Sequence, residues 1–222
     1  VDVATGRSGA EPLLGKNSQS IINGLWAIWL RLGIPKNLQV DNELSYFGSH
    51  RYPRGMGALI RLCLQLGIEL WFIPMAEPWR NGVIEKFNDF YEQKFLNKIT
   101  MTSFDELVVA SLDFENRHNS RYRYSKLGGK TPLITLTNTK AKLSFPAKEK
   151  PPTHPLPKPK TGRYHLVRFI RSDMKLNIFG ETFPVAPELQ YEYVMATVDV
   201  KEQKLKLFLD HSQVDEFEYK LR

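Results

Sequence analysis

A segment rich in proline and lysine divides this chain and limits the folds open to it. Residues 138–160 contain six prolines and six lysines. Proline fixes φ and lacks a backbone N–H, so such a segment favours extended, polyproline-like backbone over helix or central strand. We therefore predict a linker at residues 138–160, a larger folded part at residues 1–137 and a smaller one at residues 161–222.

The larger part alternates between strand-like and helix-like patterns. Apolar residues recur at spacings of three and four in the helix-like segments, whereas the strand-like segments are short apolar runs. Helices are predicted at residues 18–32, 56–66 and 82–97 and from a capping box at Ser103–Glu106 onward, and strands at residues 1–4, 10–14, 38–40 and 68–73.

The smaller part changes period. It contains five short strand-like runs within about sixty residues, separated by turns such as the one at Gly180-Glu181. These runs lie at residues 164–170, 176–179, 192–199, 205–208 and 217–219. Five short strands in so little chain predict a small SH3-like β-barrel.

Composition narrows the class of protein and its partners. The formal charge of +7 and the pI near 9.4 favour a polyanionic partner such as nucleic acid. The single cysteine, Cys63, excludes a disulfide framework and a cysteine-based zinc site, and it fits a reducing cytoplasm. We see neither a signal peptide nor an apolar run long enough to span a membrane, so we expect a cytoplasmic protein.

Two carboxylates occupy positions that suit a metal site. Asp41 follows the strand predicted at residues 38–40, and open α/β sheets place ligands at such strand ends. Glu85 lies in the first turns of a helix, off its apolar stripe. Carboxylates from a strand end and a helix provide the hard oxygen ligands that Mg²⁺ and Mn²⁺ prefer. The alternative is a turn at Asp41 and a helix-dipole partner at Glu85.

The order of several motifs resembles the catalytic core of retroviral integrases and insertion-sequence DDE transposases. The motifs are Val40-Asp41-Asn42-Glu43, Leu66-Gly67-Ile68-Glu69 and Trp79-Arg80-Asn81-Gly82-Val83-Ile84-Glu85-Lys86-Phe87-Asn88, and the resemblance covers residues 1–133. It implies an α/β, RNase H-like mixed sheet flanked by helices, and an Asp-Asp-Glu site with two Mg²⁺ or Mn²⁺ ions. Asp41 is then the second carboxylate and Glu85 the third. A small barrel after the core is similarly found in integrases and Mu-type transposases.

The position of the first carboxylate stays open. The family places it on the first of three strands, but only two strand-like runs precede residue 17 in this chain. Residues 1–6 resemble the family's second strand, which places the first aspartate upstream and leaves the chain inactive as given. Alternatively, Asp2 is the first carboxylate. The enzyme assignment, a polynucleotidyl transferase, depends on which reading holds.

Basic and amide residues near the predicted site are candidates for DNA contact. Residues 116–132 combine five positive side chains with two tyrosines and no acid. The candidates are Arg51, Arg54, Arg80, Asn81, Lys86, Arg117, Arg121, Arg123, Lys126 and Lys130. The partners implied by the resemblance are mobile-element ends, target DNA and further copies of the chain. The resemblance also implies that the protein acts on a bacterial-type chromosome.

Two classes of function follow. The first is a metal-dependent transposase or integrase that cleaves DNA strands and transfers them to a new site in DNA recombination. The second is a DNA-binding or assembly fragment of such a recombinase without catalytic activity. A third carboxylate within reach of Asp41 and Glu85 distinguishes the first class from the second.

Overall fold

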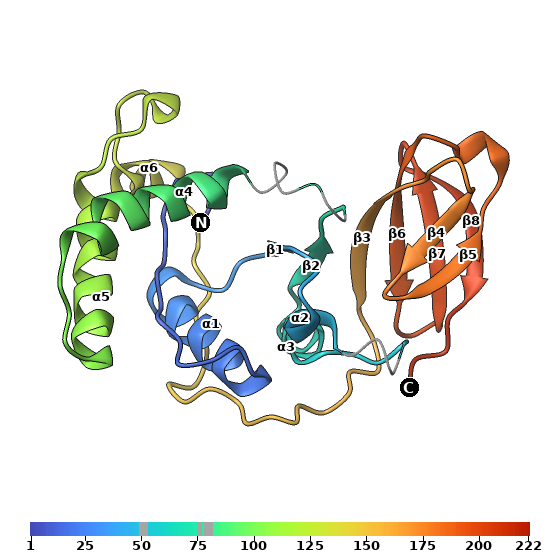
Figure 1. Cartoon of the computed structure of the whole chain (residues 1–222), viewed down its shortest axis with the longest axis horizontal. Helices are drawn as coiled ribbons and strands as arrows, with labels where there is room; N and C mark the ends of the chain where they lie inside the picture. The colour runs from blue at the N-terminus through green and yellow to red at the C-terminus, as the bar shows by residue number, and fades with distance from the viewer. Residues whose placement is uncertain (49–52, 75–76, 78–81) are drawn as a thin grey trace. The chain divides into compact units, whose positions relative to one another are not determined.

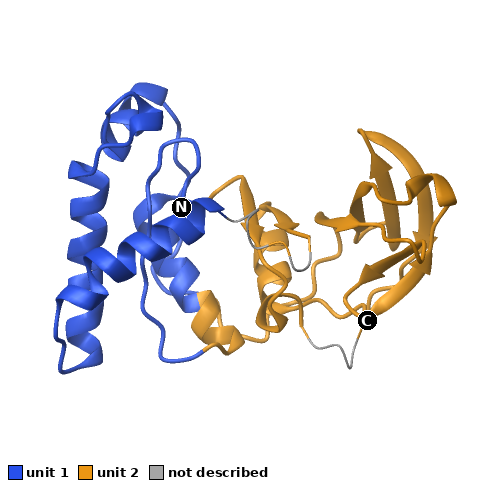
Figure 2. Cartoon of the chain, turned by 45° about the horizontal axis from the view of Figure 1, so that its top comes forward, with its two compact units in different colours: residues 1–15, 23–34, 81–151 blue, residues 16–22, 35–80, 152–222 orange. Residues whose placement is uncertain are grey.

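A computed structural model shows how the chain folds, and it describes residues 1–48, 53–74, 77 and 82–222 (Figure 1). The chain forms two compact units (Figure 2). Unit 1 comprises residues 1–15, 23–34 and 81–151, and unit 2 comprises residues 16–22, 35–80 and 152–222. Each unit therefore draws on separate stretches of the sequence. The linker and the two flanking domains remain predictions, although residues 140–162 contain neither helix nor strand.

Unit 1 is built from helices around an aromatic core. Phe87, Phe95 and Phe114 are buried together, with Ile84, Phe90 and Tyr91 packed against them. Its elements are the C-terminal part of α1 (Ser18–Leu32), α4 (Gly82–Lys94), η2 (Leu96–Lys98), α5 (Phe104–Arg121), η3 (Ser125–Leu127) and α6 (Pro132–Thr139).

Side-chain caps fix where two of these helices begin. Ser103 Oγ accepts a hydrogen bond from Glu106 N at 3.2 Å, which confirms the predicted start of α5. The Glu106 carboxylate reaches back to Thr102 N at 2.8 Å. Thr131 caps α6 in the same way, with Pro132 in the first turn. The short helix α6 has no counterpart among the predicted elements.

The two strands predicted at residues 1–4 and 10–14 are wrong. Neither segment is a strand. Residues 2–7 close a local turn, in which Asp2 N donates to Arg7 O and Gly6 N donates to Asp2 O. After this turn, side chains of α5 take the place of a neighbouring strand. Asn119 Oδ1 accepts from Ser8 N at 2.9 Å, and Asn119 Nδ2 donates to Ser8 O at 2.9 Å. An amide side chain can satisfy one backbone N–H and one C=O at once, so this segment is held without a sheet.

A buried ion pair ties α5 to α1 within unit 1. Glu115 is 3% exposed and accepts from Arg31 Nε at 3.0 Å and from Arg31 Nη2 at 2.9 Å. The same carboxylate accepts from Ala10 N at 3.0 Å, and Arg31 Nη1 donates to Glu11 at 2.9 Å. One carboxylate thus joins two helices and the N-terminal segment.

Unit 2 contains an open sheet of six strands in the order β1-β2-β3-β6-β7-β8. β1, β2 and β3 run parallel, and the pairs from β3 to β8 are antiparallel. Helix α3 packs on β2 and β3. The bounds are β1 (Asn37–Val40), α2 (Leu44–Phe47), α3 (Ala58–Leu66), β2 (Glu69–Phe72), β3 (Arg163–Phe169), β6 (Tyr193–Asp199), β7 (Lys204–Leu209) and β8 (Ser212–Glu218). This mixed sheet with helices fits the α/β class expected of an RNase H-like core.

The C-terminal strands form no SH3-like barrel in the part of the chain that the structure describes. Four of them extend the sheet of β1 and β2, while β4 (Lys175–Ile178) and β5 (Glu181–Pro184) form a separate hairpin with η4 (Pro187–Leu189) after it. Neither sheet closes on itself. The strand β5 was not predicted. The predicted barrel fails at β3, because one edge of β3 pairs with β6 and the other edge pairs with β2. Between β2 and β3, Trp71 stacks on His165 with ring centroids 4.3 Å apart.

Candidate functional site

Asp41 lies where the sequence predicts it, directly after β1. Its side chain is exposed, and Oδ1 accepts from Glu43 N at 3.3 Å, which closes a short turn before α2. The strand that carries Asp41 is fixed by its backbone, because β1 pairs in register with β2 and Ile73 N donates to Val40 O at 3.0 Å. The carboxylate is therefore held at a strand end and is open to solvent.

The residue after Asp41 is fixed by a buried arginine. Arg168, on β3, is 4% exposed, and its Nη2 donates to Asn42 Oδ1 at 2.8 Å. Arg168 also donates to Ile73 O at 3.1 Å, and Asn42 Nδ2 donates to the same carbonyl at 2.7 Å. A further bond runs from Arg168 Nε to Asn177 O at 3.1 Å. The ends of β1, β2 and β3 are thereby joined beside Asp41.

The charge of Arg168 is stabilised by oxygen dipoles. The partners that the structure gives it are carbonyl groups, one from the Asn42 side chain and the others from the backbone. Burial lowers the pKa of Arg168 to about 10. The sequence suggests Arg168 only as part of a local DNA-contacting patch with Arg163 and Arg171, whereas the structure buries it. The pattern contains a signal for this burial. Tyr164, Leu166 and Ile170 are inward-facing apolar residues on alternate positions, and Arg168 occupies the same register.

Glu85 also lies where the sequence predicts it, in the first turn of α4. Its side chain is exposed, whereas Phe87 on the same helix is buried in the aromatic core. The two carboxylates are thus on the predicted kinds of element. Asp41 belongs to unit 2 and Glu85 to unit 1, and their pairing in one site stays a prediction.

Asp2 lies on a turn, which corrects the strand position assumed for it. Its N donates to Arg7 O at 2.7 Å, and its Oδ1 accepts from Ala4 N at 3.0 Å. Its Oδ2 accepts from Thr5 Oγ1. Asp2 is exposed, but its carboxylate oxygens cap its own turn.

The donor chemistry of Asp41 and Glu85 suits a hard divalent cation, since both are exposed carboxylates. Among the described residues, however, no group of three or more His, Cys, Asp or Glu side chains lies close enough to hold an ion. Cys63 is fully buried, and burial raises the pKa of its thiol, so it is no candidate ligand or nucleophile.

The candidate DNA contacts have different surroundings. Arg51, Arg80 and Asn81 lie outside the described residues. Arg54 Nε donates to the carboxylate of Glu181 at 2.8 and 3.0 Å, and the guanidinium lies 5.0 Å from the centre of the Tyr219 ring. The positive charge of Arg54 is therefore already paired with Glu181 within unit 2. Lys86 is exposed on α4.

The other candidates gather at the end of α5 and on the loop after it. Arg117 and Arg121 are exposed on the last turns of α5. The loop is closed by Tyr124, which pairs with Lys130, and by Arg123 Nη1, which donates to Gly129 O at 3.0 Å. Lys126 and Lys130 are both exposed on this closed loop, and the Lys126 ammonium lies 5.9 Å from the centre of the Tyr124 ring.

A histidine that sequence reasoning did not assign anchors this loop. His118 is 4% exposed, and its Nε2 lies 3.0 Å from Tyr124 Oη. Burial lowers the pKa of His118. The signal in the sequence is its spacing, because His118 lies four residues after Phe114 and four before Tyr122 and so continues one aromatic row along the helix.

Comparisons with known proteins match part of the chain. Residues 66–132 match the model of the integrase core domain family, which is less than half of the 222-residue chain. The matched segment includes Glu85 and the basic loop after α5, whereas Asp41 lies before it. No curated protein matches the chain. No described helix is long and apolar enough to cross a membrane. The match indicates a DNA integration or transposase-type function for residues 66–132.

Proposed function

We propose that this chain is the core of a metal-dependent transposase or integrase that cleaves DNA strands and joins them to target DNA. The observation that carries the proposal is the integrase core match at residues 66–132, together with an exposed carboxylate at each of two expected places. Asp41 and Glu85 are proposed as the metal ligands. These two residues would hold Mg²⁺ or Mn²⁺, which in chemistry of this type would supply activation of a water or a 3′-hydroxyl and stabilisation of the leaving oxygen.

The residues of the chain itself have three tasks in this proposal. Asp41 and Glu85 supply negative oxygen atoms, and Arg168 positions the turn at Asp41 through Asn42. The exposed cations at the end of α5 and on the following loop neutralise DNA phosphates. Joining two element ends to one target further implies that several copies act together.

Binding of Mn²⁺ to the full chain tests the site. Measured by the electron paramagnetic resonance signal of free Mn²⁺, wild-type chain should bind the ion, and Asp41→Asn and Glu85→Gln should each lose most of that binding. Glu92→Gln removes an exposed carboxylate from the same helix as Glu85 and is the matched control. Unchanged binding in both site variants would contradict the proposed ligands.

A second function is favoured by the turn at Asp2. Both carboxylate oxygens of Asp2 accept hydrogen bonds within its own turn, which disfavours Asp2 as the third ligand. A chain with two carboxylates would serve as a DNA-binding or assembly module. That function predicts salt-dependent binding of duplex DNA without Mn²⁺-dependent cleavage, and a cleavage assay on labelled duplex decides between the two.

A further inference from the structure

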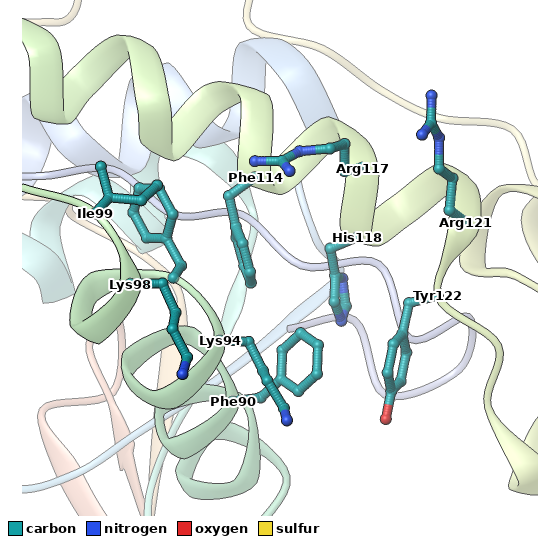
Figure 3. A pocket seen from close by; sticks show the side chains of 10 residues that line it. Phe90, Lys94, Lys98, Ile99, Phe114, Arg117, His118, Arg121 and Tyr122 are labelled. Carbon is teal, nitrogen blue, oxygen red and sulfur yellow. The ribbon is translucent and has the colours of Figure 1, made fainter.

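A pocket with aromatic walls and a cationic rim lies between α4 and α5, entirely within unit 1. Its volume is about 480 Å³, which is within the range of small-ligand sites. Figure 3 shows Phe114, His118 and Tyr122 leaving α5 on the same side, with Phe90 and Lys94 nearby. These residues take no part in the carboxylate site proposed above.

The aromatic side chains form a row along α5, and the last ring of this row is partly exposed. Along α5 the rings of Phe114 and His118 are stacked with centroids 5.9 Å apart, and those of His118 and Tyr122 with centroids 5.2 Å apart. A base between two rings needs roughly twice the 3.4 Å stacking distance, so neither gap admits one. Phe114 and His118 are buried, but Tyr122 is 37% exposed. The Tyr122 ring also meets the rings of Phe90 and Tyr124, each with its centroid 4.8 Å away, so a planar ligand would stack on the exposed part of the Tyr122 ring that these neighbours leave uncovered.

The charges around the pocket have one sign. Lys94, Lys98, Arg117 and Arg121 line it, and no acidic side chain does. The nearest acidic partner given by the structure is Asp113, which pairs with Arg117 at 2.9 Å with both side chains largely exposed. Burial lowers the pKa of His118, which keeps that ring neutral beside the cations. The pocket thus combines a flat apolar face with several positive charges.

We propose that this pocket binds single-stranded DNA, with one unpaired base stacked on Tyr122 and neighbouring phosphates on Lys94, Lys98 and Arg121. A polyanion that carries planar rings matches both features, and stacking on aromatic side chains is the usual way to hold unpaired bases. Duplex DNA does not fit, because its base faces are already covered by neighbouring base pairs. The proposal rests on the proposed DNA function and adds the substrate form: a frayed or displaced strand.

Stacking is tested with the full chain and a twelve-nucleotide thymidine strand that carries one 2-aminopurine and a fluorescein label. Tyr122→Leu should weaken binding of this strand roughly 5- to 150-fold, as expected for the loss of one stacked base, and should abolish quenching of 2-aminopurine. Tyr191→Leu removes a 63% exposed tyrosine from unit 2 and should change neither. Unchanged strand binding by a folded Tyr122→Leu variant overturns the proposal.

The charges are tested by salt dependence. The double variant Lys94→Gln, Lys98→Gln should lower the slope of log K against log salt by about 1.4, since each single-strand phosphate contributes about 0.7. Its matched control is Lys142→Gln, Lys150→Gln, which removes the same charge from exposed residues between α6 and β3. All four lysines are exposed, so these variants keep the test valid even if Tyr122→Leu fails to fold.

The remaining outcomes separate this pocket from the general DNA function. Retained duplex binding with lost single-strand binding in the pocket variants supports the proposal. Equal loss of both forms in the pocket and control variants shows a diffuse charged surface and overturns it. Competition by poly-glutamate as strong as that by thymidine strands also overturns it, because an acidic polypeptide has charge but no bases. Failure of all DNA binding by wild-type chain refutes the proposed function itself.

Discussion

Replacing Glu115 by Gln should destabilise unit 1 more than any other conservative change of a single carboxylate on α5. Glu115 is 3% exposed and accepts two hydrogen bonds from Arg31 and one from Ala10. Glutamine keeps the shape of the side chain but replaces one carboxylate oxygen by an NH₂ group. That group would face the N–H donors of Arg31 or Ala10 and could not accept their hydrogen bonds. Breaking a buried ion pair costs about 3–5 kcal/mol, and the 27% exposure of the Arg31 side chain places the expected cost near the lower end, about 3 kcal/mol.

Thermal unfolding followed by circular dichroism at 222 nm measures this cost, because most of the helices belong to unit 1. A loss of about 3 kcal/mol corresponds to a fall in Tm of about 12 °C or more for a unit of this size. Asp113→Asn is the matched control on the same helix. Its pair with Arg117 is exposed, with 62% and 52% of the two side chains accessible, so its removal should cost about 0.5 kcal/mol or less.

The result that refutes this reasoning is a Glu115→Gln variant as stable as Asp113→Asn. A double-mutant cycle with Arg31→Met adds a second check. If Glu115 acts through Arg31, the two changes together should cost at least about 1 kcal/mol less than the sum of the single changes. Additive costs would show that the carboxylate acts through Ala10 alone.

Three further predictions concern other buried groups. Arg168→Leu should lower the free energy of unfolding in urea by about 2–4 kcal/mol, because the Asn42 and Ile73 oxygens lose a buried donor; an equally stable variant would contradict this. Burial holds the pKa of His118 below its ordinary value, so the unfolded chain binds the proton more readily than the folded chain. The free energy of unfolding should therefore fall as the pH drops below 6.5. In thermal melts between about pH 5 and 8, His118→Phe should flatten this pH dependence. In the same urea assay, Gly57→Ala should cost about 1–3 kcal/mol, since a Cβ at residue 57 would lie 2.4 Å from the Tyr46 carbonyl oxygen. Gly82→Ala should be neutral or stabilising, because a Cβ at residue 82 would have nothing within 4 Å.

The local elements could be predicted because their causes are local. The cap at Ser103 and the apolar stripe of α3 lie within a few residues of what they determine, and both are confirmed. The same holds for the strand before Asp41 and the helix under Glu85. For these two carboxylates the secondary structure was predictable, whereas their pairing depends on residues far apart in the sequence.

The errors have distant causes. Residues 1–14 read as two strands by composition, but residues 2–7 close a turn, and Asn119 and Glu115 on α5 bond the backbone of the residues after it. The strands after residue 160 were predicted as a closed barrel, because nothing local shows that β3 pairs with β2. The buried role of Arg168 was not predicted for the same reason, since its partners Asn42 and Ile73 come from the ends of two other strands.

The pairing of β2 with β3 also sets an order of events during synthesis. Leu70 pairs with Tyr164, so the neighbour of β2 emerges from the ribosome long after β2 itself. Until then one edge of β2 exposes free N–H and C=O groups that invite pairing with another chain. The helices of unit 1, whose last residue is Pro151, can all form earlier. A nascent chain that has just completed the proline- and lysine-rich segment therefore carries all of unit 1 and one unpaired sheet edge. The six lysines of this segment add positive charge that opposes aggregation at that stage.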